Sequence, residues 1–210
     1  MNEDLQSSYD RVAEDYAQEF RDEMARKPFD RKMLEWLIEK VDSRGVICDM
    51  GCGPGQVARY LREQGAEACG IDLSTAMVER ARSLHPNIPF EQGDMLALER
   101  VADNSFGGIA AFYSLIHVPR PLMVQALREL MRALLSGGTL LLTFHLGEQT
   151  IHRDEWWGKE VSLDFIFFER EEMKDYLRTA GLELTEAIER DPYAEVEYQS
   201  RRAYIFARKP

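Results

Sequence analysis

The sequence predicts an α/β fold with a mostly parallel β-sheet and helices on both faces. Between residues 46 and 145, short apolar runs typical of buried strands alternate with segments whose apolar residues recur at helical spacing. Strands joined by single helices require crossover connections, which make neighbouring strands parallel. Near the end of the chain, two strand-like segments have no helix between them, which predicts an antiparallel pair.

Two amphipathic helices are expected before the first strand. Residues 5–20 place apolar side chains along one helical stripe, from Leu5 to Phe20. A second helix is expected from Pro28, a favourable residue in a first helical turn, to about Val41. Residues 1–45 are therefore assigned to N-terminal helices that precede the sheet.

The alternating segment then supplies five strands and three helices. Ser74 is expected to cap a helix that ends before Pro86, because its hydroxyl can accept a hydrogen bond from the first turn. The expected strands are residues 46–50, 68–72, 88–92, 106–113 and 139–144. The expected helices are residues 56–64, 74–84 and 121–135.

Residues 146–168 fit neither pattern and are expected to form an irregular insert that caps a binding site. The segment is long for a connection in a compact domain, and such loops are often lids or binding elements. Alternating apolar residues, from Val161 to Phe167, would equally suit a half-buried strand or a contact between two copies of the chain. A helix over 169–179, ended by Gly181, precedes strands over 182–188 and 203–207, which a short connection around Asp191 and Pro192 joins.

Composition and charge disfavour several classes of partner. Lys and Arg number 26 against 37 Asp and Glu, a net charge of −11, which opposes binding to bulk nucleic acid or to an anionic membrane. No apolar run approaches a membrane span, and the acidic start does not resemble a secretory signal. Three cysteines form no disulfide framework. We therefore expect a cytoplasmic protein with a small-molecule substrate, without nucleic-acid or membrane partners, and compatible with a homodimer.

A glycine-rich loop follows the first expected strand. In Asp49-Met50-Gly51-Cys52-Gly53-Pro54-Gly55, the glycines allow backbone N–H groups to approach a ligand with no Cβ in the way. The spacing is G-x-G-x-G and not the G-x-G-x-x-G of dinucleotide-binding proteins. Asp72 ends the second strand about 20 residues later, where a ribose-binding carboxylate is expected. Taken singly, these motifs would suit a tight turn and an Asp that flanks a helix.

Asp49 distinguishes between the ligands that such a loop could hold. A carboxylate inside a buried strand is unfavourable unless it has a cationic or hydrogen-bonding partner. It would repel a pyrophosphate and attract an ammonium group, which favours a ligand that ends in an α-amino acid. Asp94 and Met95 follow the third strand and should reach the same crevice, where Asp94 can accept from an adenine amine and Met95 can pack on the ring.

In these motifs the sequence resembles the class I S-adenosylmethionine-dependent methyltransferases, in particular the quinone-biosynthesis-like (methyltransferase type 11) group. The matching segments are residues 46–55, 70–74, 92–95 and 136–142. The resemblance implies a Rossmann-like three-layer sandwich whose seven-stranded, mostly parallel sheet has its last strand antiparallel. It also implies one domain made of a cofactor lid (1–45), an S-adenosylmethionine-binding core (46–145), a cap or substrate insert (146–168) and the remainder of the core (169–210).

The resemblance assigns residues to the cofactor, S-adenosylmethionine, whose product is S-adenosylhomocysteine. Asp49 and the glycines would hold the methionyl end, Asp72 the ribose, and Asp94 with Met95 the adenine. A tyrosine of the first helix would close over the cofactor. The expected cofactor-binding residues are Tyr16, Asp49, Gly51, Cys52, Gly53, Gly55, Asp72, Leu73, Met77, Asp94, Met95 and Ala111. The sequence departs from the family where Gly107 follows Phe106 and where Ser136 replaces a proline, which bears on the substrate more than on the cofactor.

The acceptor is expected to meet the ends of the fourth and fifth strands. Methyl transfer from a sulfonium is an in-line displacement, so alignment and exclusion of water matter most. A base is needed only if the acceptor holds its proton at neutral pH. His117 and His145 are the candidate catalytic residues, although each could instead bond to loop backbone. The candidate substrate-contacting residues are Tyr113, Trp156, Trp157 and Phe165.

Three functions remain after these arguments. The first is an enzyme, a methyltransferase acting on a small acceptor. An NAD-dependent oxidoreductase is the second, which Asp49 and the antiparallel finish oppose. A cofactor-binding protein without transfer activity is the third. No metal is expected, because the acids and histidines of the insert show no recognised ligand spacing.

Overall fold

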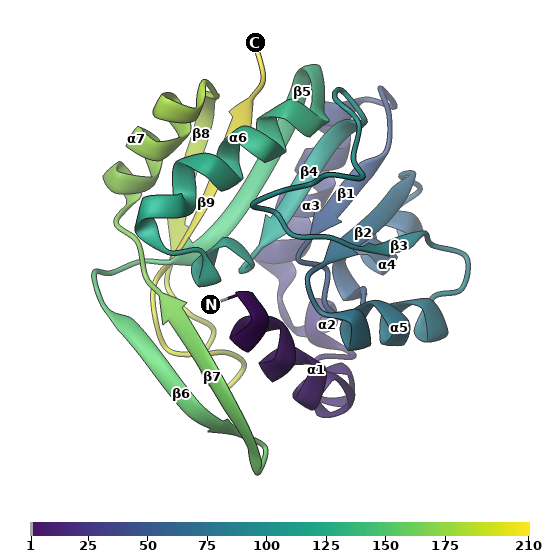
Figure 1. The fold of residues 1–210 in the computed structure, drawn as a ribbon. Coiled ribbons are helices and arrows are strands. Elements are labelled where there is room, and N and C mark those ends of the chain that lie inside the picture. Colours follow the sequence, from purple (N-terminus) through teal and green to yellow (C-terminus); the bar gives the residue numbers. More distant parts are fainter. Residues whose placement is uncertain (1) are drawn as a thin grey trace.

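The computed structural model describes residues 2–210 and is built around a seven-stranded sheet (Figure 1). In spatial order the strands are β3 (Phe90–Gln92), β2 (Ala68–Asp72), β1 (Ile47–Met50), β4 (Phe106–Phe112), β5 (Leu134–His145), β9 (Arg202–Arg208) and β8 (Glu183–Arg190). Neighbouring strands pair in parallel except β9, which is antiparallel to both β5 and β8. The predicted fold class is confirmed.

Helices cover both faces of this sheet. The helices are α1 (Asn2–Glu19), α2 (Glu23–Arg26), α3 (Pro28–Val41), α4 (Gln56–Glu63), α5 (Thr75–Leu84), α6 (Met123–Ala133) and α7 (Arg170–Ala180). In Figure 1, α6 and α7 lie in front of the sheet, and α3 and α4 lie behind it. Each face has its own buried apolar cluster, so the two helical layers are held to the sheet by separate cores.

The expected helices and strands are found, with shifts at their ends. The Ser74 hydroxyl caps α5 by accepting from the Met77 N–H at 3.1 Å, as predicted. Gly181 ends α7 in the left-handed conformation that favours glycine. The expected helix over 121–135 is shorter, because β5 already begins at Leu134, before Gly137. Helix α2 was not predicted, because four residues give no periodic signal.

The insert after β5 has regular secondary structure, so the expectation that it is irregular was wrong. It folds into an antiparallel hairpin of β6 (Thr150–Trp156) and β7 (Lys159–Ile166), which is separate from the main sheet. Val161 and Leu163 are buried, whereas the alternate residues Glu160, Ser162 and Asp164 are exposed. The alternative of a half-buried strand is confirmed, because β7 packs its apolar face against Val12 of α1.

The connection between β8 and β9 also differs from expectation. The two strands are antiparallel, as predicted, but residues 191–201 separate them and do not form a short turn. Glu197 and Tyr198, within this connection, reach the cavity described below. The sequence motif around Asp191 and Pro192 marks the end of β8 and does not indicate the length of the loop.

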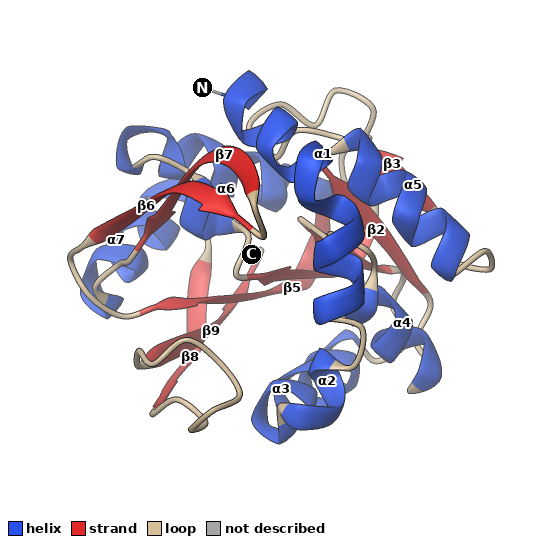
Figure 2. Cartoon of the chain, turned by 90° about the horizontal axis from the view of Figure 1, so that it is seen from below, coloured by secondary structure: helices blue, strands red, loops and turns tan. Residues whose placement is uncertain are grey.

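Helix α1 lies beside the β6–β7 hairpin, across the ends of the parallel strands (Figures 1 and 2). The Ser162 N–H donates to Ser8 Oγ at 2.9 Å and ties the hairpin to this helix. On the other side of α1, Asp10 Oδ1 accepts from the Ser74 hydroxyl at 2.5 Å and from the Ala76 N–H at 3.0 Å. Helix α1 therefore bridges the hairpin and α5 above the ends of the strands.

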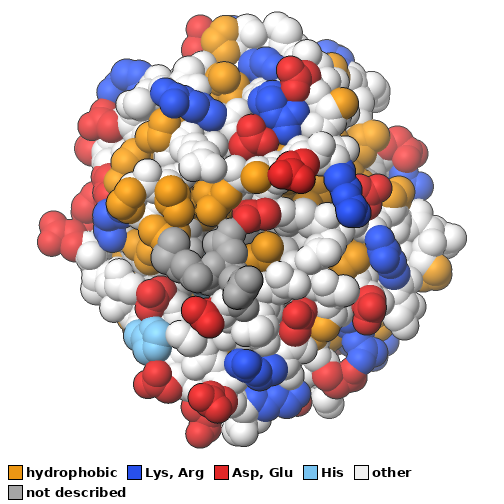
Figure 3. Space-filling model, in the orientation of Figure 1, with side chains coloured by type: hydrophobic (Ala, Val, Ile, Leu, Met, Phe, Trp, Pro, Cys, Tyr) orange, Lys and Arg blue, Asp and Glu red, His pale blue; other side chains and the backbone are white. Residues whose placement is uncertain are grey.

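The surface mixes charges of both signs. Figure 3 shows acidic and basic side chains interspersed over the face seen in Figure 1, as expected for a chain with net charge −11. In residues 2–210, every helix is too short or too polar to cross a lipid bilayer.

Candidate functional site

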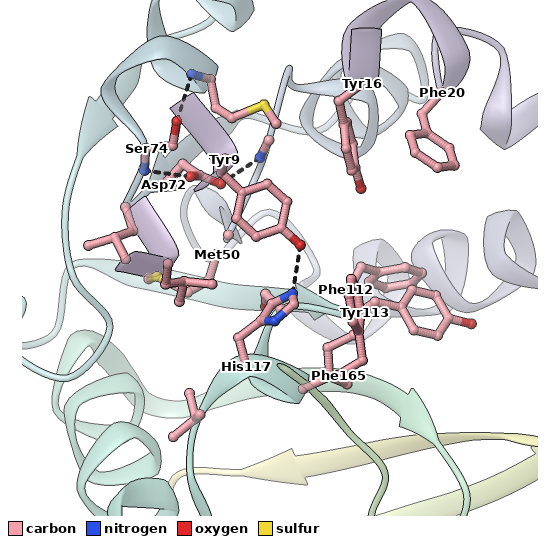
Figure 4. Close-up of a pocket in the computed structure, with 18 of the residues that line it drawn as sticks. Tyr9, Tyr16, Phe20, Met50, Asp72, Ser74, Phe112, Tyr113, His117 and Phe165 are labelled. Carbon is pink, nitrogen blue, oxygen red and sulfur yellow. Dashed lines mark hydrogen bonds between the residues drawn. The ribbon is translucent and has the colours of Figure 1, made fainter. Parts of the chain in front are cut away.

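A cavity of about 310 Å³ lies at the carboxyl ends of the parallel strands, beneath α1 and the hairpin (Figure 4). One part of its wall, which we call the loop side, contains Gly51, Gly53 and Asp72. Another part, which we call the polar side, contains Lys27, Asp30, Glu197 and Arg202. Aromatic side chains from α1, β4, the hairpin and the loop after β8 complete the wall: Tyr9, Tyr16, Phe20, Phe112, Tyr113, Trp156, Phe165, Phe167 and Tyr198.

The glycine loop turns tightly and exposes its backbone to the cavity at Gly53. Gly51 and Gly53 have φ angles of +76° and +52°, which side-chain-bearing residues rarely adopt. A Cβ placed on Gly51 would lie 2.3 Å from the Cβ of Ser114, so only glycine fits there. A Cβ on Gly53 would meet only the Tyr16 ring, at 3.8 Å, and would therefore occupy cavity space. The loop thus offers a cradle that a side chain at Gly53 would fill.

Asp72 is fixed at the end of β2 by two backbone donors. Its Oδ2 accepts from the Gly53 N–H at 2.7 Å, and its Oδ1 accepts from the Ser74 N–H at 2.8 Å (Figure 4). Burial, opposed by these backbone bonds, raises the pKa of Asp72 to about 6. Each carboxylate oxygen keeps a free lone pair. Asp72 is therefore a preorganised acceptor for paired hydroxyl groups.

Asp49 takes a different position from the one expected. Its side chain is buried below the loop, and Oδ2 accepts from the Ala58 N–H of α4 at 3.1 Å. Burial, with a smaller contribution from nearby Asp72, raises the pKa of Asp49 to about 8, against the opposing effect of the Ala58 hydrogen bond. Asp49 is not in the wall of the cavity. It can favour a cationic ligand through its field, since a nearby positive charge would stabilise the ionised carboxylate.

The structure separates the predicted cofactor residues into two groups. Eight of them line the cavity: Tyr16, Gly51, Gly53, Asp72, Leu73, Met77, Asp94 and Met95. Asp49, Cys52, Gly55 and Ala111 do not, and their predicted ligand contacts have no counterpart in its wall. The reasons are local: Cys52 belongs to the apolar cluster beside Phe90, Gly55 precedes α4 next to the same ring, and Ala111 is enclosed within the sheet.

His117 lines the cavity, but both of its ring nitrogens are engaged. Nδ1 lies 2.7 Å from the backbone carbonyl of Asp164, which can only accept, so Nδ1 carries the proton. Nε2 then accepts from the Tyr9 hydroxyl at 2.7 Å (Figure 4). Burial lowers the pKa of His117 to about 4. The side chain joins α1 to β7, and its predicted catalytic role stays a prediction.

We expect the pKa of His117 to make folding sensitive to acid. Burial lowers this pKa from 6.5 to about 4, so the unfolded chain binds the proton first as the pH falls through this window. The free energy of unfolding should therefore decrease by about 3 kcal/mol between pH 7 and pH 4, at 1.36 kcal/mol per pKa unit. Urea unfolding of the wild type and of His117→Gln at several pH values measures the effect.

The measured quantity is the difference in pH dependence between wild type and variant, because protonation of His145 also destabilises the folded chain in acid. Burial, with Arg202 and Lys27, lowers the pKa of His145 to about 3. The variant should keep only the pH dependence that His145 and the buried carboxyl groups contribute. Identical pH slopes for wild type and His117→Gln would contradict the assigned role of His117.

His145 and most of the aromatic candidates line the cavity. The His145 ring stacks on Phe167 at a centroid distance of 4.9 Å, and its Nδ1 is 2.7 Å from Ser200 Oγ. Tyr113, Trp156 and Phe165 line the cavity, and their contact with a substrate stays a prediction. Trp157 does not: it stacks on the outer side of Trp156 and is 37% exposed.

The polar side is the part that sequence reasoning missed. Asp30 and Glu197 both bind Arg190, at 2.9 and 2.5 Å, and Glu197 lies 3.2 Å from Arg202. Lys27 is 2.5 Å from Glu23 and 3.7 Å from Glu197. These charges come from α2, the start of α3, β8, β9 and the loop before β9. No local motif links such distant segments, so only the folded chain reveals the network.

Comparison with known proteins relates the chain to methyltransferases. Residues 47–138 match the family model described as a methyltransferase domain. The chain is 33% identical over 115 residues to malonyl-[acyl-carrier protein] O-methyltransferase from Pseudescherichia vulneris, covering 54% of this chain and 45% of that protein. The chain thus spans about half the length of that relative. It is 29% identical over 212 residues to a ubiquinone biosynthesis O-methyltransferase from Xylella fastidiosa, covering 86% of this chain and 84% of that protein.

A solved structure shares the fold over nearly the whole chain. The 1,6-didemethyltoxoflavin-N1-methyltransferase from Burkholderia thailandensis, solved with its substrate and S-adenosylhomocysteine, superposes with a TM-score of 0.74 at 18% identity. The match covers 98% of this chain and 87% of that protein. This likeness concerns the arrangement of strands and helices.

Proposed function

We propose that the chain is a class I S-adenosylmethionine-dependent methyltransferase, which transfers a methyl group from S-adenosylmethionine to a small-molecule acceptor. The observation that supports this most is the position of Asp72. Its carboxylate is held at 2.7 Å by Gly53 and at 2.8 Å by Ser74, in the wall of a cavity that also contains the glycine loop.

The residues of the loop side fit S-adenosylmethionine. Asp72 can accept the two ribose hydroxyls, while Asp94 and Met95 line the same cavity, where adenine would be held. The open space at Gly53 suits the methionyl end, whose ammonium group would favour ionisation of Asp49, the carboxyl buried below the loop. When bound, S-adenosylmethionine supplies an electrophilic methyl group on a positively charged sulfur.

The protein's own contribution is alignment and exclusion of water. Helix α1 and the hairpin cover the cavity, and the Tyr9–His117–Asp164 chain of hydrogen bonds holds both elements in this closed position. The aromatic rings of Tyr16 and Trp156 line it, which favours a ligand that carries positive charge. Because displacement at a methyl carbon requires an in-line approach, a fixed and dry cavity supplies most of the rate enhancement.

The lining of the cavity supports a small acceptor. The relatives named above are a malonyl-[acyl-carrier protein] O-methyltransferase, a ubiquinone biosynthesis O-methyltransferase and a 1,6-didemethyltoxoflavin-N1-methyltransferase. The largely aromatic walls of the present cavity suit a compact and partly apolar molecule beside the cofactor. The free thiols of Cys48, Cys52 and Cys69 support a reducing compartment such as the cytoplasm.

Labelled methyl transfer tests the proposal directly. The protein is incubated with methyl-labelled S-adenosylmethionine and a panel of small metabolites with hydroxyl, amine, thiol or carboxylate groups. We expect labelled product with at least one class of acceptor, and formation of S-adenosylhomocysteine in equal amount. Tight binding of the labelled cofactor with no transfer to any class would instead favour a binding protein.

A single methyl group added at Gly53 should weaken ligand binding, whereas one added at a glycine outside the cavity should not. Gly53→Ala is expected to weaken S-adenosylhomocysteine binding at least tenfold, because the new Cβ would stand in the cavity. Gly65→Ala is the matched control, since Gly65 also has a positive φ (+88°) but nothing lies within 4 Å of its added Cβ. Titration calorimetry on both variants gives the comparison. Equal affinities would contradict the placement of the ligand at Gly53.

A further inference from the structure

The polar side of the cavity holds a carboxylate that its neighbours only half satisfy. Asp30 is fully buried, and its Oδ1 accepts from the Tyr204 hydroxyl at 2.5 Å and from Arg190 Nη2 at 2.9 Å. Its Oδ2 is buried without any hydrogen-bond partner. Because a buried oxygen that lacks a donor is unfavourable, this position calls for a ligand group that donates to it.

Asp30 is held rigidly in the wall of the cavity. Arg190 binds Asp30 and Glu197 together and also donates to the Tyr204 hydroxyl at 2.8 Å. The Tyr113 hydroxyl lies 3.3 Å from that of Tyr204. Tyr113 directly follows β4 and lines the same cavity as Asp30. The network therefore connects Asp30 to the end of the strand beside which methyl transfer is proposed.

We propose that Asp30 is the proton acceptor of the reaction, and that the substrate is therefore a molecule whose acceptor oxygen or nitrogen still carries its proton at neutral pH. Phenols, alcohols and ring N–H groups belong to this class, whereas carboxylates and thiolates do not. The inference rests on the proposed methyl transfer and adds the chemical class of its acceptor. Burial raises the pKa of Asp30, against the opposing effects of Lys27, Tyr204 and Arg190, and so makes it a stronger base.

The step balances with groups already named. For a hydroxyl acceptor, the O–H bond breaks and its proton passes to Asp30 Oδ2. The electron pair left on the acceptor oxygen forms the new O–C bond, and the pair of the breaking C–S bond stays on sulfur, giving the methyl ether and S-adenosylhomocysteine. Asp30 later releases the proton to solvent. Lys27, buried beside the Tyr113 ring with Nζ 5.5 Å from its centre, can stabilise negative charge that develops on the acceptor.

The other titratable groups of the cavity are less suited to this task. The Nε2 lone pair of His117 is occupied by the Tyr9 hydroxyl, and both oxygens of Asp72 already accept backbone bonds on the loop side. His145 is a weak base, because burial together with Arg202 and Lys27 lowers its pKa to about 3. Among the residues that the structure describes, Asp30 has an oxygen, Oδ2, without a hydrogen-bond partner, and its side chain is held in place in the cavity wall.

The test compares acceptors that differ in whether they still hold a proton. Asp30→Asn keeps the shape of the side chain but cannot take a proton. At pH 7.5, labelled methyl transfer is measured with phenol and catechol, and with pentafluorophenol, which is already ionised. We expect Asp30→Asn to lose about 100-fold in kcat with the protonated acceptors and less than threefold with pentafluorophenol. A purely structural role would lower both rates equally.

Matched variants control for folding and for the loss of an ion pair. Glu129→Gln removes a partly buried carboxylate that also binds an arginine, Arg132, at 2.9 Å but lies outside the cavity wall, so its rates should equal those of the wild type. Tyr204→Phe removes one donor to Asp30 and should move the acidic limb of the kcat profile to higher pH. The charged and titratable groups that face Asp30 and share this titration are Lys27, Tyr113, Arg190, Glu197 and Tyr204.

Each outcome bears on one of the two claims. Affinity for S-adenosylhomocysteine is measured for every variant, and its absence in the wild type would count against methyl transfer itself. With cofactor binding intact, equal losses for ionised and protonated acceptors would overturn the role of Asp30. So would a wild type that methylates benzoate or thiophenol while leaving all of the protonated acceptors unchanged.

Discussion

Replacing Asp72 with Asn should weaken the binding of S-adenosylmethionine and S-adenosylhomocysteine by about 100-fold. The carboxylate is fixed by the N–H groups of Gly53 and Ser74, so it meets the ribose hydroxyls without reorganising. Hydrogen bonds to a charged group are worth about 1.5–3 kcal/mol each, and every 1.4 kcal/mol changes affinity tenfold. The amide also presents an N–H group where one backbone donor needs an acceptor, which disturbs the loop further.

Two controls separate the ribose contact from a general effect. The 2′,3′-dideoxy analogue of S-adenosylhomocysteine lacks the hydroxyls, so the substitution should weaken its binding much less than it weakens binding of the full ligand. Because burial raises the pKa of Asp72 to about 6, wild-type affinity should fall as the pH drops from 7 to 5, and the variant should not show this fall. Unchanged affinity of Asp72→Asn for the full ligand at pH 7.5 would contradict the assignment.

Gly51→Ala should destabilise the chain and abolish cofactor binding together. The new Cβ would lie 2.3 Å from the Cβ of Ser114, and Gly51 has a φ of +76°. Left-handed strain costs about 1–2 kcal/mol, and overpacking adds about 1–3 kcal/mol. We therefore expect the free energy of unfolding in urea to fall by about 2–5 kcal/mol, with S-adenosylhomocysteine binding reduced below detection.

The control for Gly51→Ala isolates the steric part. Gly65→Ala introduces the same backbone strain with open space around the Cβ and should lose only about 1–2 kcal/mol. Adding Ser114→Gly to Gly51→Ala removes the clashing atom and should recover the difference. If Gly51→Ala and Gly65→Ala are equally stable, close packing of the loop against Ser114 is not what requires glycine.

Much of the fold could be predicted, because its signals are local. The run from Val46 to Met50 with its glycine cluster predicted β1, and Ser74 predicted the start of α5. The hairpin could not be separated from an irregular cap, because Val161 to Phe167 alternate as a strand would but also as an interface would. What decides between them is burial against Val12, a contact across about 150 positions in the chain that no local pattern encodes.

The part of the site that local motifs form could be predicted. The part that forms where distant segments of the chain meet could not. The spacing of the glycines and of Asp72 along the chain was enough to predict Gly53 and Asp72, and both lie in the cavity wall. Asp49 could be identified as a buried carboxylate, but its orientation toward Ala58 depends on how α4 packs. Asp30 reads in the sequence as an ordinary acidic residue in a first helical turn. Its partners Arg190 and Tyr204 lie more than 150 positions away, so the network exists only in the folded chain.

Titration of the purified wild-type chain with S-adenosylhomocysteine and, separately, with NAD decides the central question of what the glycine loop holds. We predict one S-adenosylhomocysteine per chain with a dissociation constant in the micromolar range or tighter, and no heat of binding with NAD. Saturable binding of NAD in the absence of any response to S-adenosylhomocysteine would contradict it.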